Sequence, residues 1–280
     1  MLSHTDNAPL FNVGPRLHCT QVLPDWDLVI GHGPVLVTAI HDGHAIRNSL
    51  LPHLAIDEAS RRREEDPMTA ALTRAGDVRL VARQSRFQVD LNRPRHKCIS
   101  SDPADTWGLQ IWKPGLPGAE LDASMREHDQ FYTLVRALID ALLKQWGKVL
   151  LVDVHSYNHR RDGPQGPVAP MLGNPDIELG VTTLDRTRWG SVAKRFADVL
   201  RDHPINDAKP DVRENIRFPT GGYFPEWVYA TYGDKVCTIS PEYKKIFMDE
   251  WTGKLDIAAL EHCRDGLQHA IDAVRPEFLA

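Results

Sequence analysis

The segment 149–158 constrains the fold of this chain more than any other. Residues 149–154 are aliphatic apart from Asp153, and the polar residues His155 and Ser156 follow at once. A short, continuous apolar run is typical of a strand that is buried on both faces of a parallel sheet. Polar residues at the carboxyl end of such a strand lie where open α/β sheets bind ligands. The segment therefore predicts a parallel sheet with His155 at its ligand-binding edge.

Two further apolar segments end in the same way. Residues 35–40 run into His41-Asp42-Gly43-His44, and residues 236–240 run into Pro241-Glu242. Apolar residues spaced three and four apart predict amphipathic helices. The helices expected are 68–74, 122–147, 189–200 and 256–274, and further strands are expected at 78–82, 86–89 and 177–183. The alternation of strands and helices along the chain predicts a three-layer α/β/α fold with a central, mostly parallel (mixed) sheet.

The length of the chain suits one large domain. With 280 residues it can bury a sizeable core, and we expect residues 1–280 to form a single domain. Residues 1–26 show no period and predict an extended lead-in. The segments 95–121 and 158–175 are rich in Pro and Gly and predict long loops. Loops of this length inside a compact domain are usually functional, so we expect 95–121 to shape substrate choice.

Composition excludes several classes of partner. The net charge of −5, without any overriding basic run, argues against a nucleic-acid partner. No apolar run is long enough to span a bilayer, and no signal peptide is visible, so we expect no membrane partner. Four scattered cysteines without a CxxC pair predict reduced thiols. These features predict a cytoplasmic protein, and they carry no signal for its oligomeric state.

The ends of the three apolar segments predict a metal site. If the strands are parallel neighbours, two or three imidazoles, those of His41, His155 and also His44 if it turns inward, converge with several carboxylates on one edge of the sheet. Neutral imidazole is a favoured ligand for zinc, and a catalytic zinc keeps three protein ligands and an open position for water. A hydrolase of this kind also needs a base to move a proton to the departing amine, and Glu242 is the candidate. The planar guanidinium of Arg93 is suited to a substrate carboxylate, with Asn92 as a second donor.

Five motifs, in order, resemble those of the N-formylglutamate amidohydrolase family. They cover most of the chain, from about residue 33 to residue 250. The signature that resembles arginine-aromatic-x-Val-Asp-Leu-Asn-Arg is present at 86–93. The others are a strand ending in His-x-Gly at 34–43, Asp-x-His-Ser at 153–156, Pro-Asp-x-x-Leu-Gly at 175–180 and Gly-Gly-Tyr at 221–223.

The resemblance implies a fold similar to that of the zinc carboxypeptidases and of the aspartoacylase and succinylglutamate desuccinylase group. It implies a zinc ion, or another divalent metal, held by two histidines and an acidic residue, with His41 and His155 at the positions of the histidines. Glu242 falls near the general acid/base, Asn92 and Arg93 fall on the residues that hold a substrate carboxylate, and Gly222 belongs to the substrate-binding Gly-Gly-Tyr motif.

The third metal ligand stays open in the sequence. His44 stands where the zinc-peptidase pattern His-x-x-Glu would have an acid. Either His44 takes that role or an acid from Glu64-Glu65-Asp66 does, and Asp66 is slightly favoured over Glu65.

The activity implied is the hydrolysis of a small N-acyl amino acid, by default N-formyl-L-glutamate to formate and L-glutamate. Two alternatives remain open at this point. One is a carboxypeptidase-like zinc amidase that acts on a peptide or a cell-wall fragment. The other is a metal-dependent or ligand-binding relative that has lost catalysis, which the non-acidic residue 44 keeps open.

Overall fold

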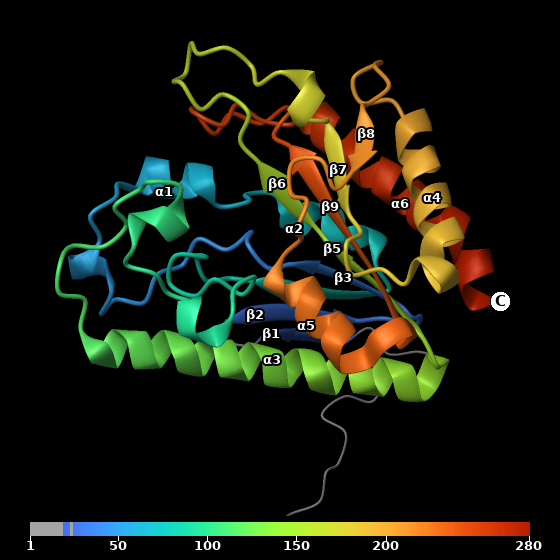
Figure 1. Ribbon diagram of the computed structural model, residues 1–280, viewed down its shortest axis with the longest axis horizontal. Helices are drawn as coiled ribbons and strands as arrows, with labels where there is room; N and C mark the ends of the chain where they lie inside the picture. Colours follow the sequence, from blue (N-terminus) through green and yellow to red (C-terminus); the bar gives the residue numbers. More distant parts are fainter. Residues whose placement is uncertain (1–18, 23–24) are drawn as a thin grey trace, which may run out of the picture.

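The computed structural model describes residues 19–22 and 25–280 and has one mixed sheet at its centre (Figure 1). Strands β3 (Val35–Ala39), β5 (Val149–Asp153) and β9 (Val236–Lys244) are parallel neighbours. Beyond β3 follow β4 (Val78–Ala82), β2 (Trp26–Ile30) and β1 (Cys19–Val22), of which β4 is parallel to β3 while β2 and β1 are each antiparallel to their neighbours. Beyond β9 follow β7 (Ile177–Gly180) and β8 (Val212–Glu214), and β6 (His155–Tyr157) also pairs with β9.

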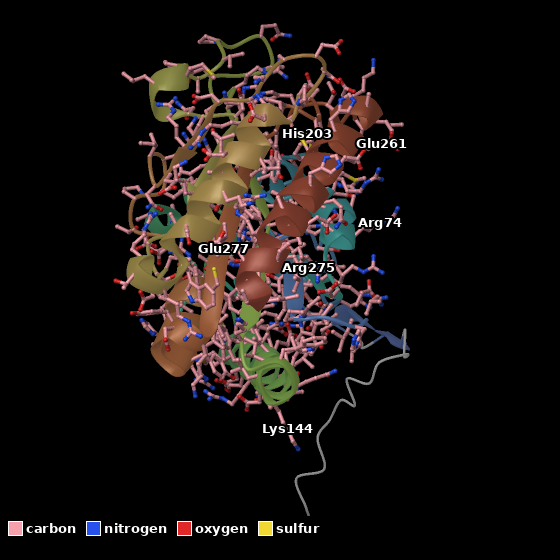
Figure 2. The ribbon with its side chains drawn as sticks, turned by 90° about the vertical axis from the view of Figure 1, so that its right-hand side faces the viewer. Arg74, Lys144, His203, Glu261, Arg275 and Glu277 are labelled. Carbon is pink, nitrogen blue, oxygen red and sulfur yellow. The ribbon has the colours of Figure 1, made fainter. Side chains whose placement is uncertain are left out.

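Helices cover both faces of this sheet, because alternate residues of its central strands point to opposite sides. Val35, Val37, Leu150 and Val152 pack with α4 (Arg186–Asp202) and α6 (Ile257–Leu279). Leu36, Val149 and Leu151 pack with α3 (Gly118–Trp146) and α5 (Tyr223–Tyr232) on the other side. Figure 2 shows α4 and α6 side by side over one face, with α3 seen along its axis below. The predicted three-layer architecture is confirmed.

Local signals in the sequence set the ends of the long helices. Asp185 caps α4 by accepting hydrogen bonds from the backbone N–H groups of Thr187 and Arg188, and Asp256 caps α6 in the same manner. Gly147 ends α3 in the left-handed conformation that glycine adopts without a steric penalty. In the described part of the chain, no helix combines the length and the apolar composition needed to cross a membrane.

Shorter helical elements connect these parts. Helices α1 (Glu58–Glu64) and α2 (Thr69–Leu72) lie between β3 and β4 in the sequence, and α2 continues as a 3₁₀ turn, so the helix expected at 68–74 is present. The 3₁₀ turns are Leu51–His53, Thr73–Ala75, Arg95–Lys97, Pro103–Thr106, Met171–Gly173 and Gly233–Lys235.

Several predicted elements differ in the structure. Residues 86–89 form a turn in which the N–H groups of Gln88 and Val89 bond the carbonyl of Ser85, so the strand expected there is wrong. Phe87 and Val89 are buried all the same, which is why an apolar alternation was visible. Of the expected lead-in, 19–22 is a strand, whereas 1–18, 23 and 24 lie outside the described residues.

Other differences concern element ends. Helix α3 begins at Gly118, inside the loop expected at 95–121. The segment 203–226, which the sequence predicts to be irregular, contains β8 and the start of α5. Strand β9 does not end before Pro241 but continues to Lys244. It pairs with β5 as far as Ile239 and with β6 from Glu242 onward, so Pro241 lies where the partner changes. A missing backbone donor is tolerated at such a point.

Gly43 supports the close approach of two segments beside the sheet. A Cβ atom at this position would overlap the backbone carbonyl of Arg83. We expect Gly43→Ala to lower the free energy of unfolding by about 1–3 kcal/mol, because the two backbones must separate. Urea denaturation measures the change. Gly173→Ala is the matched control, since a Cβ there meets open space, and an equal loss in both variants would contradict this account.

Candidate functional site

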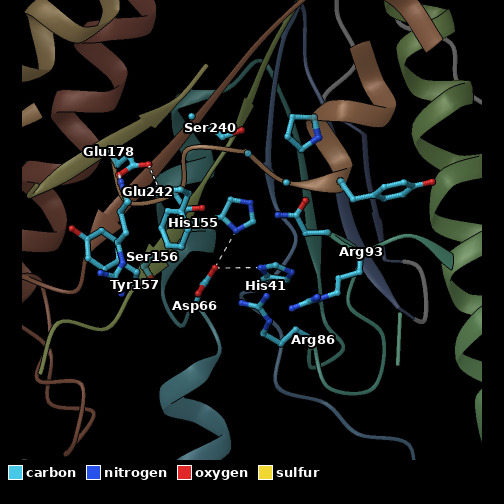
Figure 3. Close-up of a pocket in the computed structure, with 18 of the residues that line it drawn as sticks. His41, Asp66, Arg86, Arg93, His155, Ser156, Tyr157, Glu178, Ser240 and Glu242 are labelled. Atoms are coloured by element: carbon cyan, nitrogen blue, oxygen red, sulfur yellow. Dashed lines mark hydrogen bonds and ion pairs between the residues drawn. The ribbon is translucent and has the colours of Figure 1, made fainter. Parts of the chain in front are cut away.

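A cavity of about 820 Å³ opens at the carboxyl ends of the central parallel strands (Figure 3). Residues that follow β3, all of β6 and the end of β9 contribute to its floor, and loops from 86–107 and 217–223 contribute to its walls. This is the edge of the sheet at which the sequence predicted a ligand site. Its position follows from the three parallel strands β3, β5 and β9, which bring distant segments to one place.

Three buried side chains meet at the floor of this cavity. His41 lies two residues beyond β3, His155 begins β6, and Asp66 follows α1. Asp66 Oδ2 lies 3.1 Å from His155 Nδ1 and 3.5 Å from His41 Nδ1. One potential ligand atom from each residue lies within 4.8 Å of the other two, and Figure 3 shows the three side chains turned toward one another. We refer to them as the His-Asp-His cluster.

Each histidine of the cluster is oriented by a second carboxylate. Nε2 of His41 lies 2.8 Å from Asp90, and Nε2 of His155 lies 2.8 Å from Asp153. Both imidazoles therefore direct Nδ1 toward Asp66. Histidines that bind metals are held in this way, with one ring nitrogen on a carboxylate and the other on the ion.

The donor set fits a divalent metal ion. Nδ1 of His41 is buried and has no hydrogen-bond partner within the described residues. Burial alone would raise the pKa of Asp66, but its hydrogen bond with His155 and the adjacent imidazole of His41 outweigh burial and lower that pKa. Burial also disfavours a charged His155, yet Asp153 raises the pKa of that imidazole well above its ordinary value. Two imidazole nitrogens and one carboxylate oxygen are a common ligand set for catalytic zinc.

Of the other candidates for the third ligand, His44 and Glu65 bond with each other instead, and Glu64 pairs with Arg63 and Arg161. His44 Nδ1 lies 2.5 Å from Glu65, and Arg61 donates to both side chains. The hydroxyl of Ser85 also donates to Glu65. The structure therefore brings Asp66, but neither His44 nor Glu65, to His41 and His155. The spacing His-x-x-His suggested a shared site because sequence does not reveal which way each side chain turns.

A buried lysine fixes the segment that carries Asp66. Lys245 Nζ donates to the carbonyls of Arg63 and Glu65, at 2.6 and 2.8 Å, and to the side chain of Asn158 at 2.9 Å. The backbone N–H of Asp66 in turn donates to the carbonyl of His41 at 3.0 Å. Asp66 is thus held from both the end of β9 and the end of β3.

Glu242 lies inside β9, directly opposite His155 of β6. No hydrogen bond engages its carboxylate within the part of the chain that the structure describes. Burial, with the negative charges of Asp66 and Asp153, raises the pKa of Glu242 to about 8, although the charge of His155 acts in the opposite direction. A carboxyl group with a pKa near neutrality can both accept and release a proton during a reaction.

The predicted substrate-binding residues lie on one wall of the cavity. Arg93 donates to the carbonyl of Asp105 at 2.7 Å and remains partly exposed. The side-chain oxygen of Asn92 accepts the backbone N–H of Phe224 at 2.9 Å, in the first turn of α5. Gly222 precedes that helix, and a Cβ at Gly222 would overlap the Asn92 amide. Asn92 therefore shapes the wall of the cavity by anchoring α5. Contacts of Asn92, Arg93 and Gly222 with a substrate stay predictions.

Sequence reasoning assigned no role to several residues of the cavity. Arg86 forms an ion pair with Asp90 at 3.0 Å and lies under Trp107, 4.8 Å from the ring centroid. The spacing of four between Arg86 and Asp90 was a readable signal for such a pair. Glu178 of β7 also lines the cavity, but nothing in its motif indicated what it binds.

Known proteins resemble this chain both in sequence and in structure. The family model described as N-formylglutamate amidohydrolase matches residues 33–242. The structure of N-formylglutamate amidohydrolase from Ralstonia eutropha JMP134 superposes with a TM-score of 0.70 at 17% identity, covering 91% of this chain and 100% of that one. Gene product Atu2144 from Agrobacterium tumefaciens gives a TM-score of 0.61 at 19% identity, with 90% and 96% of the chains covered. The comparison with curated proteins gave no match.

Replacing Lys245 tests the role of its three hydrogen bonds. In Lys245→Met the carbonyls of Arg63 and Glu65 lose their buried donor, so we expect the free energy of unfolding to fall by about 2–4 kcal/mol in urea denaturation. Lys235→Met, on the exposed turn before β9, serves as the control and should change it by less than about 0.5 kcal/mol. A Lys245 variant as stable as the control would show that the hydrogen bonds contribute little.

Proposed function

Because the chain belongs to the N-formylglutamate amidohydrolase family, we propose that it cleaves N-formyl-L-glutamate to formate and L-glutamate. Family membership makes the chain a hydrolase that acts on amide bonds. The observation that carries the proposal is the His-Asp-His cluster at the floor of a cavity of about 820 Å³, beside the carboxyl of Glu242, which accepts no hydrogen bond from any residue that the structure describes. A cavity of this size lies within the range of small-molecule binding sites.

A zinc ion is the proposed cofactor, held by His41, Asp66 and His155. Such an ion would polarise the acyl carbonyl and lower the pKa of water. The two carboxylates behind the histidines support this assignment, since they fix the ring orientation that a metal ligand requires. Imidazole and carboxylate groups also bind other divalent ions, and the affinity of the site alone does not select zinc among them.

In this proposal, side chains of the cavity transfer the proton during hydrolysis and orient the substrate. Glu242 removes a proton from the attacking water and delivers it to the departing nitrogen. Arg86, which lines the cavity and is paired with Asp90, donates a guanidinium N–H to the carbonyl oxygen as negative charge develops there. Arg93 binds the α-carboxylate of the substrate through its planar fork. Asn92 and Gly222 shape the wall on which that carboxylate rests.

Turnover is the direct test of this proposal. The wild-type protein, reconstituted with zinc, should release formate from N-formyl-L-glutamate. Glu242→Gln removes the proton carrier while keeping the size of the side chain, so kcat should fall by about 10²–10⁴-fold. Zinc content, measured in parallel, should stay the same. A Glu242→Gln variant as active as the wild type would remove this residue from the mechanism, and absence of formate release by the wild type would reject the substrate.

Metal content tests the ligand set separately from activity. His41→Ala, Asp66→Ala and His155→Ala should each lose bound zinc after dialysis, because each removes one of three donors. His44→Ala should retain about one zinc per chain, since His44 lies outside the cluster. Mass spectrometry of the metal, with circular dichroism to confirm folding, gives both readings. Loss of zinc from His44→Ala to the same extent as from His155→Ala would contradict the assignment.

A further inference from the structure

Arg217 differs from the other arginines that line the cavity. Arg93 lies 3.7 Å from two carboxylates, those of Asp90 and Asp105, and Arg161 lies 3.4 Å from Glu64. Arg86 pairs with Asp90 at 3.0 Å. Within residues 19–22 and 25–280, no carboxylate lies within 4.0 Å of the Arg217 guanidinium. Among the described residues, the one acceptor of a hydrogen bond from this guanidinium is the side-chain oxygen of Asn174, which carries no charge.

The unpaired guanidinium of Arg217 is half-buried against aromatic rings. Its central carbon lies 4.6 Å from the ring centroid of Tyr157 and 5.5 Å from that of Phe218. Nε is inaccessible to solvent and has no hydrogen-bond partner among the described residues. Burial lowers the pKa of Arg217. Removing a cation even partly from water is costly when no carboxylate among the described residues lies within 4.0 Å of it, so this arrangement favours the binding of an anion from the cavity.

The backbone at Arg217 is fixed by the sheet. The two carboxylate oxygens of Glu178 accept the N–H groups of Arg217 and Phe218, at 2.5 and 2.7 Å. Glu178 belongs to β7 and is fully buried. The carboxylate of Glu178 is therefore occupied by the backbone of this loop. The guanidinium is presented from a rigid base, as a binding residue requires.

The position of Arg217 suits the far end of a substrate. Tyr157, on which the guanidinium lies, follows the cluster residue His155 by two positions in β6. Two strand residues span about 6.6 Å, which is comparable to the reach of an extended acidic side chain. Figure 3 shows Tyr157 and Glu178 on the opposite side of the His-Asp-His cluster from Arg93. A substrate whose amide lies at the cluster can thus extend toward both arginines.

We propose that Arg217 binds the side-chain carboxylate of a dicarboxylic N-acyl amino acid and selects such substrates over neutral ones. The inference rests on the proposed function, in which Arg93 binds the α-carboxylate. The planar fork of a guanidinium matches the two oxygens of a carboxylate.

The kinetic test compares a charged substrate with its neutral analogue. In Arg217→Met, KM for N-formyl-L-glutamate should rise at least roughly tenfold, because a hydrogen bond to a charged group is lost. KM for N-formyl-L-glutamine should change by less than about threefold, since the amide carries no charge to pair. Arg217→Lys keeps the positive charge but lacks the planar fork of a guanidinium. Its KM for N-formyl-L-glutamate should therefore lie between those of the wild type and Arg217→Met.

The matched control is Arg186→Met. Arg186 forms an ion pair with Glu214, three residues before Arg217, and does not line the cavity. This variant should leave both KM values unchanged. Thermal unfolding of all variants separates loss of a ligand contact from loss of folding. Equal increases in KM for both substrates in Arg217→Met would overturn the proposal.

A binding measurement keeps this inference independent of turnover. Glutarate, a dicarboxylate, should raise the melting temperature of the zinc-loaded wild type more than butyrate does at the same concentration. Arg217→Met should abolish that difference, whereas Arg186→Met should preserve it. This result supports the subsite even if no formate is released, in which case the proposed reaction alone fails. Equal responses to glutarate in wild type and Arg217→Met would overturn the subsite whatever the activity.

Discussion

The interaction on which the site depends is the pairing of each buried imidazole with a carboxylate behind it. His41 rests on Asp90 and His155 rests on Asp153, and Asp153 also accepts the hydroxyl of Thr38 at 2.5 Å. These contacts turn both Nδ1 atoms toward Asp66. Without them, two imidazoles beside one carboxylate would rotate to satisfy their own hydrogen bonds. The carboxylates thus convert a group of polar residues into a set of converging donors.

The sheet supplies the other constraint. Parallel strands end at the same edge, so β3 and the β5–β6 segment deliver His41 and His155 side by side. Strand β9 changes its partner from β5 to β6 at Pro241, and this change places Glu242 opposite His155. Pro241 therefore lies where its missing N–H does little harm, directly before Glu242, the proposed acid/base residue. The change of strand partner thus explains both why a proline is tolerated inside β9 and why Glu242 lies next to His155.

Sequence predicted those parts of the structure that depend on local pattern. The apolar runs at 35–40 and 149–154 indicated central strands, and their polar ends indicated where His41 and His155 meet. The turn at 86–89 was mistaken for a strand because buried Phe87 and Val89 alternate in a turn as they would in a strand.

Side-chain direction and distant pairing were not readable from the sequence. Whether His44 or Asp66 joins His41 depends on Arg61 and Ser85, which hold Glu65 and His44 away from the cluster. Likewise, the sequence does not show that the Arg217 guanidinium lacks a nearby carboxylate among the described residues. This property depends on which side chains the fold places around it. Such features arise from contacts between residues far apart in the chain, where no short motif records them.

The lysine that holds the Asp66 segment has a consequence for biosynthesis. Lys245 contacts the carbonyl of Arg63 across 182 residues of sequence. His41, Asp66 and His155 all leave the ribosome well before Lys245 does. The contacts that close over so long a separation form late, because they must first overcome the entropy of closing the chain. A nascent chain that has synthesised every residue of the cluster thus still lacks the side chain that fixes it, and the site is completed only when the last strand joins the sheet.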